Sequence, residues 1–265
     1  MAGQARSGAA GAIPEGIEQA VGRLVLRNAA VAAITAVVVV FASSPALAAA
    51  RGRSGPNHRV RYGVSTNWAG YAVSGFGPYT TVSASWTQPA VDCSKTPTGY
   101  SVFWVGLDGD TSKTVEQTGT EANCVGGSAS YAGWYEMFPK RPVISSNRVE
   151  PGDSLTASVS AGVKGSFHLT LTDATQGWSL NTTQKKKSAR RASAEVIAEA
   201  PATRKGVLPL ADFAPASFAS ATINGSLLTE TTPGVEPITM KQGETVKATP
   251  SGLSGGNFSV TWQHA

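Results

Sequence analysis

The feature that most limits the fold of this chain is a series of short segments in which apolar and polar residues alternate. In the stretch 166–172 every second residue is Phe or Leu, and Phe258, Val260 and Trp262 alternate with polar residues near the end of the chain. A period of two places the apolar side chains on one face of a β-strand. After the first fifty residues, no window of helical period reaches three turns. We therefore predict an all-β domain.

Clusters of Gly, Asn, Asp, Pro and Ser separate these segments, and such clusters favour turns. The chain contains 29 Gly and 15 Pro, enough for many turns but too few for a low-complexity polymer. Eight examples of the predicted strands are Tyr79–Trp86, Ser101–Leu107, Tyr131–Phe138, Ser154–Val159, Ser166–Thr172, Ala194–Ile197, Ala216–Ile223 and Asn257–Gln263. Antiparallel strands at this spacing predict a two-sheet β-sandwich.

The first 48 residues predict a signal peptide. Arg23 and Arg27 precede the apolar run 29–42, which is shorter than the roughly 20 residues that a membrane-spanning helix needs. Ala46-Leu47-Ala48 fits a small-x-small cleavage site, so we expect cleavage after Ala48. An uncleaved N-terminal anchor is the alternative. Residues 49–62 are predicted to form a basic, flexible lead-in, and residues 63–265 the β-sandwich domain of a secreted, extracellular protein.

Export changes the interpretation of the two cysteines. Cys93 and Cys124 are the only pair in the chain, and two thiols outside the cytoplasm usually oxidise to a disulfide. In the chain-entropy model, a bridge closing a loop of about thirty residues stabilises a fold by about 3–4 kcal/mol. A catalytic cysteine would instead need a histidine partner, and the chain has three histidines. The count favours the disulfide.

The charge pattern gives little support for a nucleic-acid partner. The chain has 22 basic and 17 acidic residues, a formal net charge of +5. Its densest basic run is Lys185–Lys187 with Arg190 and Arg191, and no aromatic residues are interleaved to stack on bases. We predict that this run forms a solvated hairpin tip. Asn181-Thr182-Thr183 matches a glycosylation sequon, and whether it is used is left open.

Several catalytic classes are excluded by missing motifs. The chain has no His-Glu-x-x-His and neither Asp-Thr-Gly nor Asp-Ser-Gly, which excludes zincins and pepsin-like dyads. One Gly-x-Ser-x-Gly occurs at 252–256, in a glycine turn before the last strand, where a nucleophile elbow cannot form. With three His and two Cys, few ligands remain for zinc or iron, and no metal or cofactor is predicted.

Strand parity predicts which of the remaining polar residues share a face with aromatic ones. A Glu on an otherwise apolar face is costly unless it is hydrogen-bonded or functional, as for Glu136. Side chains pointing the same way are predicted within each of four groups: Trp104, Gly106 and Asp108; Trp134, Glu136 and Phe138; Val115 and Gln117; Glu195, Ile197 and Glu199. These groups predict an aromatic-floored groove that carries carboxylates.

At these residues the sequence resembles the glutamic peptidases (eqolisins), formerly classed as peptidase family A4, in their bacterial form. The resemblance extends from Asn67 to about Phe218. Six blocks carry it in the family's order: Asn67-Trp68-Ala69-Gly70-Tyr71, Phe103-Trp104-Val105-Gly106-Leu107-Asp108-Gly109, Glu116-Gln117-Thr118-Gly119-Thr120, Trp134-Tyr135-Glu136-Met137-Phe138-Pro139, Ser193-Ala194-Glu195-Val196-Ile197-Ala198-Glu199-Ala200-Pro201 and Pro209-Leu210-Ala211-Asp212-Phe213.

The resemblance implies a concanavalin A-like sandwich of two curved antiparallel sheets, with polypeptide substrates bound on the concave face. It also implies a Gln/Glu dyad, with Gln117 as oxyanion stabiliser and Glu199 as general base and acid, and no cofactor or metal. The positions that match cleft-lining residues of the family are Trp68, Trp104, Asp108, Trp134 and Glu136. We expect a monomeric endopeptidase that acts at acidic pH, because a neutral glutamine keeps its state at every pH.

Other functions remain open at this point. A β-sandwich of this kind could bind or hydrolyse carbohydrate, with Glu136 and Glu199 as its two carboxylates. The Glu-x-Asp-x-x-Glu run of sandwich glucanases is absent. A peptide-binding module without catalytic activity is the third possibility.

Asp108 and Asp110 lie close together in the chain, in a Gly-Asp turn. They could shape this turn or bind calcium.

Overall fold

The computed structural model of this protein describes residues 63–265. The predicted signal peptide (1–48) and lead-in (49–62) lie outside the described residues. From Gly63 to the C-terminus, no helix is long and apolar enough to span a membrane. This part of the chain consists of β-strands and one short 3₁₀ turn, η1 (Val163–Gly165).

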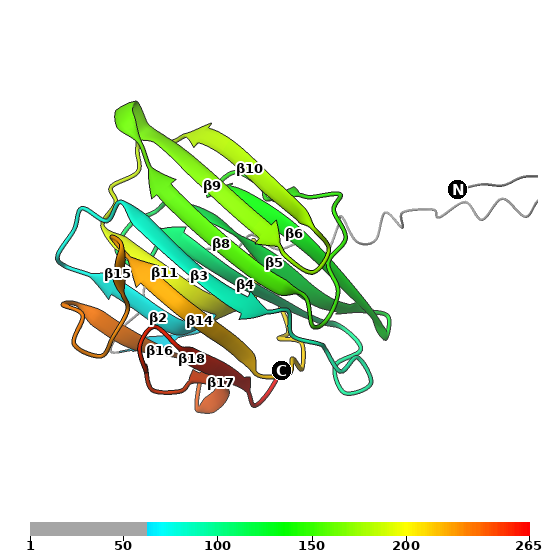
Figure 1. Cartoon of the computed structure of the whole chain (residues 1–265). Helices are drawn as coiled ribbons and strands as arrows, with labels where there is room; N and C mark the ends of the chain where they lie inside the picture. The colour runs from blue at the N-terminus through cyan, green and yellow to red at the C-terminus, as the bar shows by residue number, and fades with distance from the viewer. Residues whose placement is uncertain (1–62) are drawn as a thin grey trace, which may run out of the picture. The chain divides into compact units, whose positions relative to one another are not determined.

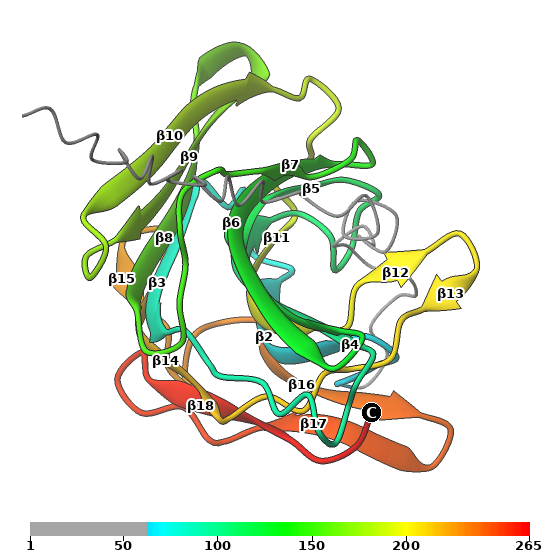
Figure 2. The same ribbon diagram turned by 90° about the vertical axis from the view of Figure 1, so that its right-hand side faces the viewer.

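The strands form two layers, which we call sheet I and sheet II (Figures 1 and 2). In spatial order, sheet I contains β7 (Val143–Ile144), β6 (Ser128–Phe138), β5 (Val115–Val125), β4 (Gly99–Leu107), β11 (Ser193–Glu199), β2 (Trp68–Ser74) and the first half of β16 (Val235–Gln242). Sheet II contains β10 (Trp178–Lys185), β9 (Ser166–Asp173), β8 (Ser154–Ala161), β3 (Thr81–Thr87), β14 (Ala216–Ile223), β18 (Phe258–Trp262), β17 (Thr245–Pro250) and the second half of β16.

Shorter strands extend these layers. β1 (Val64–Ser65) pairs in parallel with β16, and β15 (Ser226–Leu227) pairs with β14. β12 (Ala202–Thr203) and β13 (Gly206–Val207) form a separate hairpin. The strand pairs within the two layers are otherwise antiparallel, so the predicted antiparallel β-sandwich is confirmed.

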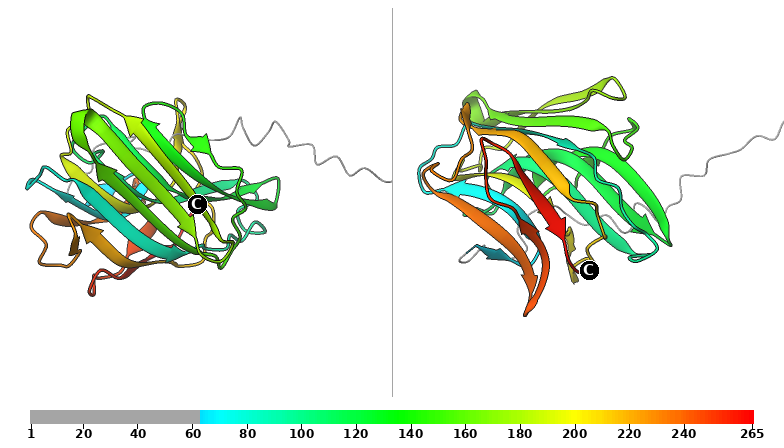
Figure 3. Two further views of the ribbon diagram at one scale, coloured as in Figure 1. Left: turned by 45° about the horizontal axis from the view of Figure 1, so that its top comes forward. Right: turned by 60° about the horizontal axis from the view of Figure 1, so that its bottom comes forward.

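Strand β16 joins the two layers. Its residues 235–238 pair with β2, whereas 240–242 pair with β17, and the register shifts between Met240 and Lys241. A bulge bends a strand and increases its twist, so one strand can serve two sheets. The right-hand view of Figure 3 shows these orange and red strands closing one side of the sandwich.

The space between the sheets is filled by the apolar faces of both. Phe103 of sheet I packs edge-on against Phe213 at a centroid distance of 5.3 Å, and Phe218 stacks on Phe258 at 5.0 Å. Trp86 on β3 donates its indole N–H to the Thr120 hydroxyl on β5 at 3.1 Å. The Trp86–Thr120 hydrogen bond joins the two layers and shows which face of β5 points inward.

All eight predicted strands occur, with ends that differ by a few residues, as β3, β4, β6, β8, β9, β11, β14 and β18. The eight did not include β2, β5, β10, β16 or β17. β5 is polar in sequence, yet all but its last residue are buried. Alternation between apolar and polar residues therefore cannot reveal a strand that is covered on both faces.

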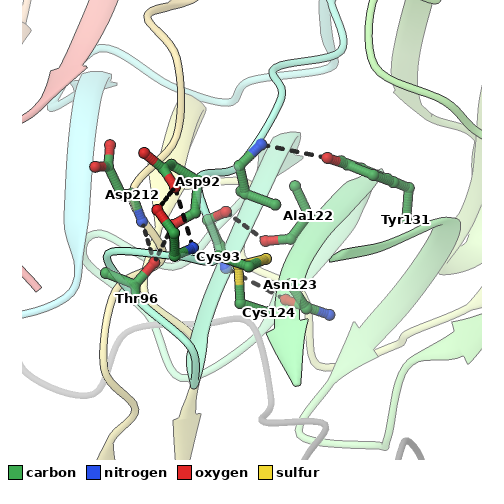
Figure 4. Close-up of a disulfide and its surroundings, with 11 residues drawn as sticks. Asp92, Cys93, Thr96, Ala122, Asn123, Cys124, Tyr131 and Asp212 are labelled. Carbon is green, nitrogen blue, oxygen red and sulfur yellow. Dashed lines mark hydrogen bonds between the residues drawn. A yellow bond between two sulfur atoms is a disulfide. The ribbon is translucent and has the colours of Figure 1, made fainter. Parts of the chain in front are cut away.

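The predicted disulfide is present. Cys93 and Cys124 are bonded, with their Cα atoms 5.3 Å apart (Figure 4). The bridge ties the loop before β4 to the end of β5. Around it, the Thr96 hydroxyl accepts the Asp212 N–H at 2.9 Å, and Tyr131 accepts the Val91 N–H at 3.2 Å. The loop is thus anchored to three neighbouring segments.

The prediction of a hairpin tip for the basic run is wrong. Lys185 ends β10 at the edge of sheet II, and residues 186–192 lead to β11 in the interior of sheet I. β10 pairs with β9, while β11 pairs with β2 and β4. The charge pattern correctly indicated contact with solvent, but strand pairing depends on distant residues that the local pattern does not contain.

Candidate active site

The face of sheet I that points away from sheet II carries its own cluster of large side chains. Trp68, Trp104 and Trp134 lie there with Val115 and Ile197, separate from the core between the sheets. The parity predicted from the sequence is confirmed, because Phe103, Val105 and Leu107 of the same β4 strand belong to the inner core. Trp68 and Trp104 meet edge-on, with ring centroids 5.1 Å apart.

Gln117 lies on this face in the middle of β5. It is opposite Gly106 on β4 and opposite Glu136 on β6. The Gln117 side-chain Nε2 donates to Glu136 Oε2 at 3.1 Å, and both residues are fully buried. The hydrogen bond fixes the direction in which the Gln117 amide points.

Glu199 ends β11 on the same face, and both of its carboxylate oxygens accept hydrogen bonds. Asn67 Nδ2 donates to Oε1 at 2.9 Å, and Trp104 Nε1 donates to Oε2 at 2.8 Å. Asn67 is itself placed by Ser65, whose hydroxyl accepts the backbone N–H groups of Asn67 and Trp68. Hydrogen bonds of this kind favour an ionised carboxylate and restrict its orientation.

Glycines make room for these side chains. A Cβ on Gly119 would lie 2.0 Å from the Phe103 carbonyl oxygen and 2.7 Å from Trp104. A Cβ on Gly106 would lie 2.8 Å from the Trp104 ring and 3.2 Å from the Cβ of Gln117. Trp104 can therefore occupy the middle of the face only because its neighbours on β4 and β5 lack side chains.

The two residues predicted as the catalytic dyad flank β4. Gln117 on β5 is opposite Gly106, and Glu199 on β11 is opposite Val102, so Trp104 lies between these two positions on the same face. The structure thus brings together Gln117, Glu199 and Glu136 with the three predicted tryptophans. The sequence analysis assigned no role to Asn67. Its position next to Trp68, which was predicted to line the cleft, could have indicated that Asn67 lies near the site.

Asp108 directly follows β4 and contacts the segment that leads into β11. Its two carboxylate oxygens accept the backbone N–H groups of Arg190, Arg191 and Ala192, each at 2.8 Å. The buried carboxylate therefore anchors the connection between β10 and β11 to the end of β4. Within residues 63–265, no group of three or more His, Cys, Asp or Glu is arranged to hold a metal ion.

Three further carboxyl groups lie at this end of sheet I. Burial raises the pKa of Glu116 to about 9, with a further contribution from the nearby Asp108 charge. Burial also raises the pKa of Glu195 well above its ordinary value, with Asp110 and Asp108 adding to the effect. The pKa of Asp110 is raised by burial and by the charge of Glu236. Parity had placed Glu195 on the face of Glu199, but not in this acidic group.

Two buried donors on this face lack a protein partner. The indole N–H groups of Trp68 and Trp134 make no hydrogen bond with any of the described residues. Buried donors are nearly always paired in native proteins, so each exception needs an explanation. The face combines orphan donors, an oriented amide and a held carboxylate, which is an arrangement suited to a polar ligand with acceptor oxygens.

Comparison with known proteins identifies the family. The model of the peptidase A4 family matches residues 66–262. This chain belongs to that family. Aspergillopepsin-2 of Aspergillus niger is 30% identical over 223 residues, which cover 75% of this chain and 78% of the relative.

Solved structures show the same fold. SCP-B, a member of the eqolisin family in complex with the tripeptide Ala-Ile-His, matches with a TM-score of 0.61 at 24% identity, covering 75% of this chain and 98% of the other. Aspergilloglutamic peptidase from Aspergillus niger matches with a TM-score of 0.56 at 29% identity, covering 62% and 99%. The resemblance to the glutamic peptidase family is confirmed, and this chain is a glutamic-type endopeptidase.

Proposed function

We propose that the protein hydrolyses peptide bonds with Glu199 as general base and acid and Gln117 as oxyanion stabiliser. The observation that carries this proposal is the setting of Glu199. Its two oxygens are held by Asn67 and Trp104 on the same face of sheet I as the oriented amide of Gln117. The peptidase family sets the reaction class and disfavours the glycosidase alternative.

The chemistry requires two groups. Glu199 takes a proton from a water molecule as the water oxygen attacks the substrate carbonyl, and later returns the proton to the leaving nitrogen. An N–H of Gln117 stabilises the oxyanion that develops, a contribution of about 3–4 kcal/mol for one such donor in other acyl-transfer sites. The amide is neutral at every pH, so it adds no charge that would oppose the oxyanion.

The tryptophans would hold the substrate. A polypeptide offers backbone carbonyls at regular intervals, which are suitable acceptors for the orphan indole N–H groups of Trp68 and Trp134. The tripeptide bound to the related SCP-B supports a peptide ligand for this fold. We assign to Glu136 the role of orienting the Gln117 amide. We assign to Asp108 the role of holding the segment that leads into β11, the strand that carries Glu199.

We also propose that the enzyme is active at acidic pH. Asp110, Glu116 and Glu195 all have raised pKa values in the folded protein, so the fold binds protons that the unfolded chain releases. Their contribution to stability is complete below their ordinary pKa values and is lost as the pH rises through the folded values. The buried carboxyls next to the site therefore favour a protein that works in acid.

We further propose that the chain is exported as a monomer, with a signal peptide removed after Ala48. The Cys93–Cys124 disulfide is consistent with an oxidising compartment. Sequencing the N-terminus of the protein in culture supernatant tests the cleavage site. Recovery of intact Met1 in a membrane fraction would indicate an anchor instead.

The decisive experiment compares Glu199→Gln with the surface control Glu244→Gln in hydrolysis of denatured casein over a pH series. Glu199→Gln removes the proton acceptor, so turnover should fall to background in a folded protein. Glu244 is fully exposed on the β16–β17 turn, and its replacement should change nothing. Near-native casein hydrolysis by Glu199→Gln would overturn the assignment and make Glu136 or Glu195 the candidate.

Gln117→Ala tests the second member. Loss of one oxyanion donor should lower turnover by about 10²–10³. Glu136→Gln, which changes the partner of Gln117 but not the amide itself, should retain part of the activity. Soluble glucans assayed in parallel should release no sugar, and release of sugar without peptides would favour the carbohydrate alternative.

A further inference from the structure

A cavity lies away from the proposed dyad, between the turn that joins β8 to β9 and the connection from β10 to β11. Its volume is about 400 Å³. The residues that define it are Gly162, Lys164 and Phe167 on one side and Lys186, Lys187 and Arg191 on the other. Of these residues Phe167 is buried, whereas Lys164 and Lys187 are exposed to solvent.

All charged residues that line this cavity are positively charged. Four of its lining residues are basic, and its lining contains no Asp or Glu. None of these four side chains forms an ion pair with another described residue, whereas Lys95, Arg148 and Lys241 elsewhere each pair with a carboxylate. Four cations around one cavity repel each other, so an anion bound between them would relieve that repulsion.

The backbone around the cavity is fixed in advance. The Lys186 N–H donates to the Gly165 carbonyl at 2.8 Å, which ties the two walls together. Gly165 has a φ of +70°, and a Cβ there would lie 3.1 Å from the Cα of Lys187, so the close approach needs glycine. Asp108 holds the N–H groups of Arg190 and Arg191 from behind.

The half-buried Lys186 is also restrained. Its Nζ donates to the Phe138 carbonyl at 2.9 Å, which leaves two of its three N–H donors for a ligand. A restrained cation loses less conformational entropy when it binds than a free surface lysine does. The site thus differs from a solvated run of charges, which is what the sequence had suggested for residues 185–191.

We propose that this cavity binds a ligand carrying several phosphate or sulfate groups. A single oxyanion is much smaller than the cavity, and four cations exceed its charge, so a chain of such groups is the better match. Lys and Arg stay protonated from acidic to neutral pH. Phosphate and sulfate esters also stay charged in acid, where the carboxylates of an acidic peptide would be neutralised. The binding does not depend on the peptidase reaction.

The test is calorimetric titration of the full purified chain with inorganic tripolyphosphate in low salt, at pH 5 and pH 7. The double variant Lys164→Glu/Lys187→Glu should bind about tenfold more weakly or worse, because two attractive charges become repulsive. The matched control is Arg204→Glu/Lys205→Glu on the exposed β12–β13 turn, which changes the net charge equally and should shift the affinity by less than about twofold.

The proposal would be overturned by no binding of the native chain, by equal weakening in both double variants, or by orthophosphate binding as tightly as tripolyphosphate. Dextran sulfate titrated in the same way separates the two sources of the ligand chemistry. Tighter binding of dextran sulfate would indicate a sulfated polymer, and tighter binding of tripolyphosphate a phosphate chain. A polyglutamate peptide that bound more tightly than either at pH 5 would overturn the assignment to phosphate or sulfate.

Discussion

The two outward faces of the sandwich are both formed by antiparallel strands but carry very different side chains. On sheet II, the outward positions carry short hydroxyl side chains that pair across strands, as in Ser85 with Thr156 at 2.8 Å and Thr172 with Ser179 at 2.9 Å. On sheet I, the outward positions carry tryptophans, a glutamine and glutamates. Both sheets present their inner faces to one shared core.

The difference shows how two faces built from similar strands come to present different chemical groups. The hydroxyls of sheet II satisfy one another at the surface. On sheet I, glycines at Gly106 and Gly119 open space on the sheet surface, and large side chains fill it and hold Glu199. In both sheets the alternation along the strands determines which residues point outward. On sheet I, the mixture of large, small and hydrogen-bonding residues at those outward positions forms the candidate site.

Of the three changes that compare the two faces, the largest effect should come from removing a donor on the sheet I face. Trp104→Phe keeps an aromatic ring but loses the N–H that bonds Glu199, an interaction worth about 1.5–3 kcal/mol when the partner is charged. We expect kcat for casein to fall by about 10- to 100-fold. Trp178→Phe is the matched control on sheet II, because Trp178 donates to the Arg148 carbonyl at 2.7 Å. Equal losses in both variants would contradict a specific role for Trp104.

A smaller effect should appear in the pH dependence of stability. Glu116 has an ordinary pKa of 4.5 and a folded pKa of about 9, so its stabilising contribution is complete below about pH 4.5 and is lost as the pH rises towards 9. Glu116→Gln removes this loss. Its Tm should exceed that of the native protein at pH 8 and approach it at pH 4, as followed by thermal unfolding. A constant difference at both pH values would argue against a buried, protonated Glu116.

The smallest effect is expected on the sheet II face. The double change Ser85→Ala/Thr156→Val removes both members of an exposed hydroxyl pair at once and leaves no buried polar atom behind. The free energy of unfolding in urea should change by no more than about 0.5 kcal/mol, and casein hydrolysis should be unchanged. A loss of activity would show that the two faces are coupled through the core.

Much of the fold could be predicted because it depends on local patterns. Alternation in β9 and β18 placed their apolar faces correctly, and parity put Glu136 beside Trp134 and Glu199 beside Ile197. β5 was harder, because a polar strand buried on both faces has no alternation to detect. The connection 186–192 was misplaced for a different reason, since its course depends on which distant strands pair with β10 and β11.

The sequence by itself determined the all-β class, the pairing of Cys93 with Cys124, the family and the residues that share a strand face. Each of these depends on spacing along the chain or on the order of short motifs. Only the tertiary structure decided that Asn67 and Trp104 hold Glu199, that Asp108 anchors a connection more than eighty residues away, and that four cations surround one cavity. These contacts join residues far apart in the chain, and their distances are set by strand register and by the bend at β16, which no local pattern encodes.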